Sequence, residues 1–88
     1  MERRGHLTVD ADSAYREDFL RVAGGFAEEA RRLECAGDLH EAANWWHCAG
    51  ALYCEAARVA PDDVIREGHL AAAAECDRLA RVAGMTTE

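Results

Sequence analysis

The chain has 88 residues, which is enough for one small domain. Its ten arginines, absent lysines and seventeen acidic residues give a formal net charge of −7, which disfavours direct binding of nucleic acid because phosphate recognition begins with cationic side chains. No apolar run is long enough for a membrane span, and no apolar signal segment follows Met1. We therefore expect a cytoplasmic protein without membrane contact.

Alanine dominates the composition, with nineteen residues. Alanine favours helices but buries little surface, so helices lined with it enclose a thin core. A small chain of this kind gains stability by oligomerising, and we expect a homodimer. We expect the four cysteines to stay reduced in the cytoplasm and to be buried, acting as small apolar residues.

The chain begins with residues 1–12, which lack periodicity and are predicted to form a flexible N-terminal arm. A single helical domain is predicted over residues 13–84, with Asp12 or Ser13 as the first N-cap. Its first helix carries one apolar stripe, formed by Tyr15, Phe19, Val22, Phe26, Ala30 and Leu33. Gly24-Gly25 interrupts the pattern and indicates either a kink, a break into two helices, or a close approach of another backbone.

Gly37-Asp38 is predicted to end this helix and to cap the second, which covers roughly residues 39–60. The second helix has the most regular pattern of the chain, with one stripe of Leu39, Ala42, Trp46, Ala49, Tyr53, Ala56 and Ala60. A second stripe lies beside it and consists of Trp45, Cys48, Leu52 and Val59. Two adjoining stripes predict a central helix that contacts more than one neighbour.

Pro61 stops the second helix, and Asp62-Asp63 favours the start of a third. The inward stripe of the third helix is Ile65, His69, Ala72, Cys76, Leu79 and Ala83, before Gly84 closes it and residues 85–88 form a tail. Short connections favour antiparallel neighbours. The predicted fold is all-α: a small three-helix bundle built on an antiparallel helical hairpin.

The sequence gives little indication of a metal site or a catalytic site. His40, His47 and Cys54 recur every seven residues, which separates them by about 10 Å along a helix, too far to share one metal ion. His47 and Cys48 are neighbours that point about 100° apart, so they do not form a nucleophile–base pair. We expect no catalytic residues, no metal and no cofactor.

Trp45-Trp46 is the most informative pair, because adjacent helix positions cannot easily bury against the same neighbour. In one interpretation Trp46 fills the intramolecular core and Trp45 lies on its flank. In the other, Trp45 lies at a partner or subunit interface, where aromatic side chains concentrate binding energy. The residues predicted for such an interface are Leu39, Trp45, Trp46, Leu52 and Tyr53.

Residues 27–49 resemble the core motif of the ANR family, small bacterial regulators named as AraC-family negative regulators. That motif joins an Ala-x-x-Leu-Glu segment to a Gly-Asp turn, an Ala-Ala pair and a Trp. The matching positions are Ala30, Leu33, Glu34, Gly37, Asp38, Ala42, Ala43 and Trp46. Downstream, Arg66-Glu67 and Cys76 resemble the closing part of the family motif.

The resemblance implies a non-enzymatic cytoplasmic regulator that self-associates and modulates transcription by binding a transcription factor or a nucleoid-associated protein. The acidic charge suits a basic protein partner of this kind. A second hypothesis is a small acidic inhibitor of a nucleic-acid enzyme, such as an anti-defence protein encoded by a mobile element. Small size, helicity and negative charge fit both functions.

Overall fold

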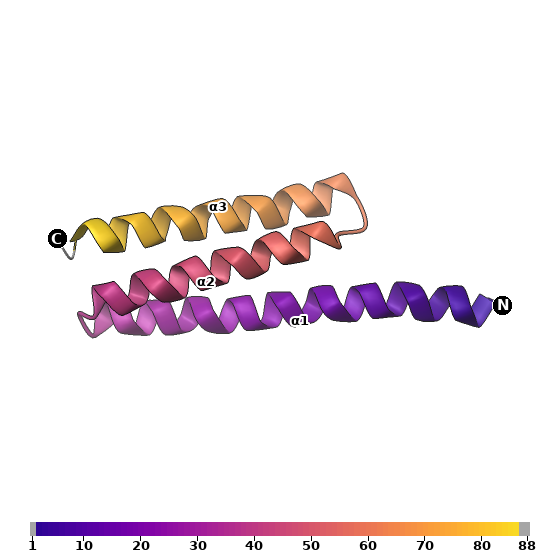
Figure 1. Ribbon diagram of the computed structural model, residues 1–88, viewed down its shortest axis with the longest axis horizontal. Coiled ribbons are helices and arrows are strands. Elements are labelled where there is room, and N and C mark those ends of the chain that lie inside the picture. The colour runs from indigo at the N-terminus through magenta and orange to yellow at the C-terminus, as the bar shows by residue number, and fades with distance from the viewer. Residues whose placement is uncertain (1, 87–88) are drawn as a thin grey trace.

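The computed structural model describes the backbone of residues 2–86 and the side chains of residues 14–84. This part of the chain forms three helices, α1 (Glu2–Cys35), α2 (Leu39–Arg58) and α3 (Asp63–Thr86). Figure 1 shows α2 between the other two, antiparallel to both, with α1 running on past the α2–α3 turn at its N-terminal end. Helix α2 packs along α1 and α3, which approach each other only marginally. The all-α helical bundle is thus confirmed, with α2 at its centre.

Local sequence signals explain the two connections. Gly37 adopts a φ of +86°, which closes α1, and the backbone N–H of Asp38 donates to the carbonyl of Leu33 at 2.9 Å. The Asp38 carboxylate accepts from the backbone N–H of Glu41 at the start of α2. Before α3, the Asp62 carboxylate accepts from the backbone N–H of Ile65 at 2.9 Å. The predicted turn at Gly37-Asp38 and the restart at Asp62-Asp63 are therefore confirmed.

Helix α1 differs from its prediction at its N-terminal end and at Gly24-Gly25. It begins at Glu2, so the loose segment predicted over residues 1–12 is helical from residue 2, and the predicted N-cap at residues 12–13 is wrong. It also continues through Gly24 and Gly25 without a break. Isolated glycines weaken a helix by about 1 kcal/mol each relative to alanine, which long flanking helical segments can absorb. Helix α3 likewise extends past Gly84 to Thr86, whereas residues 87–88 of the predicted tail lie outside the described residues.

The core is thin, as the alanine content predicted. Nine of the eleven buried side chains in the described part are alanine, and the other two are Trp46 and Cys76. Trp46 belongs to a buried cluster that joins all three helices and contains Ala27, Ala30, Ala49 and Cys76. Alanine pairs allow close approach of helix axes, so one tryptophan fills most of the remaining space.

The apolar stripe predicted for the first helix is only partly buried. The buried positions are Ala23, Ala27 and Ala30, whereas Tyr15 and Val22 of the predicted stripe are 61% and 41% exposed. Small residues face α2 because the bulky Trp46 already occupies the space between the helices. The larger apolar side chains of α1 are displaced to the edge of the contact. The inward stripes predicted for α2 and α3, in contrast, are buried or half-buried throughout.

Close packing of α2 on α3 depends on Gly50. A Cβ at this position would lie 3.3 Å from Cys76 Cβ and 3.4 Å from the carbonyl oxygen of Ala73, whereas a Cβ at Gly24 would meet nothing within 4 Å. Replacing a helical glycine with alanine normally stabilises by about 1 kcal/mol. We predict that Gly24→Ala gains this amount, and that Gly50→Ala loses it because α2 and α3 must move apart. Urea unfolding of both variants measures the difference, and equal gains would contradict this account.

Candidate functional site

Trp46 is fixed by α1. Its indole Nε1–H donates to Glu34 Oε2 at 2.7 Å, and the guanidinium of Arg31 lies over its ring, 5.2 Å from the centroid. Only 2% of Trp46 is exposed. The hydrogen bond satisfies the one polar group that a buried tryptophan carries, and the guanidinium adds a cation–π contact. Trp46 is therefore part of the α1–α2 contact and is not presented on the surface of this chain.

Trp45 lies on the outer edge of the same contact. Its ring meets Phe26 of α1 edge-on, with centroids 5.0 Å apart and planes at 67°, a favourable aromatic geometry. Phe26 and Trp45 are both half-buried. Along α1, Phe26 follows Tyr15, Phe19 and Val22 at steps of four and three residues, which places them on one face.

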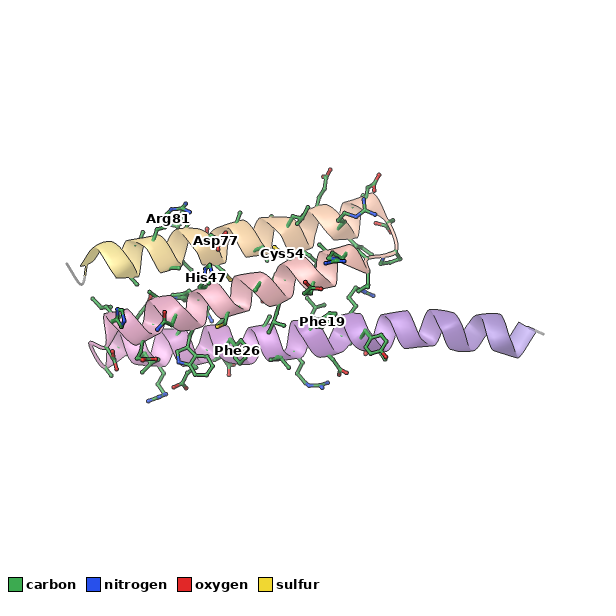
Figure 2. The ribbon with its side chains drawn as sticks, viewed as in Figure 1. Phe19, Phe26, His47, Cys54, Asp77 and Arg81 are labelled. Carbon is green, nitrogen blue, oxygen red and sulfur yellow. The ribbon has the colours of Figure 1, made fainter. Side chains whose placement is uncertain are left out.

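We call these five residues the aromatic seam: Tyr15, Phe19, Val22 and Phe26 of α1 with Trp45 of α2. Figure 2 shows Phe19 and Phe26 on α1, away from the labelled polar residues of the other two helices. Four of the six aromatic side chains of the protein lie in the seam. Aromatic side chains that gather at a surface, and are not scattered over it, are typical of protein-binding sites.

The remaining residues of the predicted interface lie on α2, as Trp45 and Trp46 do. Leu39, Leu52 and Tyr53 are all half-buried, and Tyr53 packs against the central cluster that contains Trp46. Leu52 lies two turns from Trp45 on the same face of α2, so it extends the seam on that helix. The sequence analysis missed the α1 half of the seam. The signal was present in the 4-3-4 spacing from Tyr15 to Phe26, which the sequence analysis described only as one apolar stripe.

Several positions of the ANR-like motif lie at the turn between α1 and α2 or in the contact between these two helices. Gly37 and Asp38 form the turn, and Ala30 and Ala42 are fully buried where α1 meets α2. Glu34 and Trp46 form the hydrogen bond described above. Leu33 and Ala43 are half-buried, and Cys76 packs in the central cluster from α3. Each motif position thus has a structural role in closing the hairpin or in covering it.

A shallow depression of about 430 Å³ is lined by residues of α2 and α3. Its lining consists of Ala43, Asn44, His47, Asp77, Ala80 and Arg81. Figure 2 shows His47 on α2 and Asp77 on the neighbouring stretch of α3. His47 Nδ1 and Asp77 Oδ1 are 4.0 Å apart, beyond hydrogen-bond distance, and both side chains are more than half exposed. No cysteine or serine lines the depression, so its lining residues supply no nucleophile–base pair.

Among residues 14–84, no group of three or more His, Cys, Asp or Glu side chains is arranged to hold a metal ion. None of the helices in the described part of the chain combines the length and apolar character needed to cross a membrane. Comparison of the chain with protein-family models, with curated proteins and with solved structures finds no match. The ANR resemblance therefore stays a prediction.

The cysteines differ sharply in environment. Cys35, Cys48 and Cys54 are exposed, whereas Cys76 is buried, so the expectation of buried apolar cysteines is confirmed for Cys76 and wrong for the other three. Burial raises the pKa of the Cys76 thiol, and the negative charges of Asp77 and Glu75 raise it further, against a smaller opposite effect of Arg31. Because the thiolate is the reactive form, Cys76 is a poor nucleophile.

We predict two phases when a disulfide reagent titrates the native protein near neutral pH. The three exposed thiols react fast, and Cys76 reacts slowly until denaturant is added. The stability that the raised pKa contributes is complete below the ordinary pKa of cysteine and is lost as the pH rises through the raised value. The Cys76→Ala variant should lack the slow phase, and reaction of all four thiols at one rate would contradict the assignment.

Proposed function

We propose that this chain is a non-enzymatic regulator that binds another protein, and that its target is a transcription factor or a nucleoid-associated protein. The observation that carries the protein-binding part is the aromatic seam, where Tyr15 and Val22 are exposed and Phe26 and Trp45 are half-buried in an edge-on pair. Rigid aromatic side chains of this kind supply most of the binding energy of many interfaces.

The class of target is supported by charge. A net charge of −7 favours association with a basic surface, and DNA-binding proteins carry such surfaces. The ANR-like positions between Ala30 and Trp46 support a transcriptional role in particular. An inhibitor of a nucleic-acid enzyme draws support from the same charge, and it stands as the second candidate.

A substitution of Trp45 in the aromatic seam tests the proposed binding of a transcriptional regulator. We expect Trp45→Ala to weaken binding of the native target by about tenfold or more, because it removes the indole that packs on Phe26. Val64→Ala is a matched control, since Val64 is 81% exposed on α3 and lies outside the seam. The measurement is co-purification of the tagged full chain with its target, identification of the target by mass spectrometry, and titration of the purified pair.

Recovery of a DNA-binding regulator whose affinity falls with Trp45→Ala and not with Val64→Ala supports the proposal. Recovery of a nuclease, polymerase or helicase favours the inhibitor. Absence of any such protein, or equal affinities for the two variants, contradicts a protein-binding role of the seam. Circular dichroism of both variants shows whether the helices remain intact.

A further inference from the structure

The face of α1 that points away from α2 carries charged and small residues that are arranged symmetrically about Gly25. Ala23 and Ala27 face α2, and Gly25 is two residues from each, so it lies about 200° around the helix on the opposite side. Steps of four and three residues from Gly25 define one stripe in both directions. Its members are Ala14, Asp18, Arg21, Gly25, Glu29 and Arg32 of α1, with Ala36 in the turn directly after the helix; we call them the outer stripe.

The charges of the outer stripe are arranged so that two antiparallel copies of it complement each other. Asp18 and Arg32 are each seven residues from Gly25, and Arg21 and Glu29 are each four residues from it. An antiparallel copy of α1 related by a two-fold axis at Gly25 therefore places Asp18 opposite Arg32 and Arg21 opposite Glu29. Every charge on the stripe then faces the opposite charge, and alanines face each other at both ends. All members of the stripe are exposed except Glu29, which is half-buried.

Gly25 has no role inside the chain. A Cβ built on it would meet nothing within 4 Å, its φ is helical, and the residue is exposed. Glycine in a helix interior is unfavourable by about 1 kcal/mol relative to alanine. A glycine on the two-fold axis, flanked by alanines at the ends of the stripe, permits two helix backbones to approach closely.

The charges within one copy are compatible with such a contact. Arg21 pairs with Asp18 at 2.7 Å, and Arg32 pairs with Glu29. The Arg32 hydrogen bond lowers the pKa of the Glu29 carboxyl, so this acid is ionised over a wider pH range. Two acids and two arginines make the stripe neutral, although the whole chain carries −7. Two copies can therefore meet here without the repulsion that their net charge produces elsewhere.

Apolar surface borders the stripe on one side. Val22 is 41% exposed and lies about 60° from Gly25 on the helix, with Phe26 and Tyr15 of the aromatic seam beyond it. A two-fold axis perpendicular to both helices brings the same flank of each copy together. The Val22 flank of one helix then meets the Val22 flank of the other and loses contact with water.

We propose that the chain forms an antiparallel homodimer through the outer stripe of α1, centred on Gly25. The Asp18–Arg32 and Arg21–Glu29 pairs between copies set the direction and register of the helices. The small residues permit close packing, and the Val22 flank supplies apolar contact. The two aromatic seams then lie side by side along one edge of the dimer. This inference does not rest on the proposed function.

The test is sedimentation equilibrium of the full chain and of charge variants. We expect the native chain to be dimeric, and Asp18→Arg to raise the dimer dissociation constant by about tenfold or more, because it places two arginines opposite each other. Adding Arg32→Asp should restore the dimer. The double variant places two arginines at positions 18 and 21 and two acids at positions 29 and 32, so each pair between copies is again opposite in charge.

The double variant separates the dimer from helix stability. It removes both ion pairs within the outer stripe, so an effect on the isolated helix would make it worse than either single variant. Glu75→Arg is the matched control, because it changes the net charge equally and breaks the exposed Arg78–Glu75 pair of α3 outside the stripe. It should leave the dissociation constant unchanged.

Three results would overturn the proposal. The first is a native chain that is monomeric at about 100 µM, a concentration well above typical dissociation constants of specific complexes. The second is an Asp18→Arg variant with the same dimer dissociation constant as the native chain. The third is a double variant that does not recover the dimer although circular dichroism shows intact helices. A monomeric chain would leave the co-purification result for the aromatic seam unaffected, so the two proposals fail separately.

Discussion

The hydrogen bond between Trp46 and Glu34 is the constraint on which the rest of the structure depends. In a core made almost wholly of alanine, Trp46 is the one large buried side chain of the described residues, and its indole N–H needs an acceptor. Glu34 supplies it from the last turn of α1, three residues before the Gly37 turn. The bond therefore fixes the register of α2 against α1 next to the turn that joins them.

That register determines which apolar side chains become available to partners. Alanines of α1 face α2 because the indole of Trp46 occupies the remaining volume, and the bulkier Tyr15, Phe19, Val22 and Phe26 move to the edge. There Phe26 meets Trp45. A thin alanine core and an aromatic edge are thus two consequences of one packing arrangement. The surplus apolar surface lies on α1 and Trp45, so we place binding there and not on the central stripe of α2.

Much of this could be predicted from the sequence. Turn chemistry at Gly37-Asp38 and Asp62 is local, so it located both connections, and the regular spacing of α2 identified the central helix. The burial of Trp46 and the flanking position of Trp45 also matched one of the two interpretations. For α1 the spacing gave one apolar stripe but not which of its members a neighbouring helix covers: Ala30 is buried, whereas Tyr15 and Val22 are exposed. The helix across residues 2–12 was missed since it lacks a regular apolar stripe.

The most direct test of the account is the free energy of unfolding of Glu34→Ala compared with Glu34→Gln. Removing the acceptor leaves the buried indole N–H unpaired, so Glu34→Ala should destabilise by about 1–3 kcal/mol, whereas glutamine retains an acceptor oxygen and should lose less. Glu28→Ala, at an exposed position of the same helix, controls for the loss of a carboxylate. If Glu34→Ala is no less stable than Glu28→Ala, the bond does not hold the hairpin together and the account is wrong.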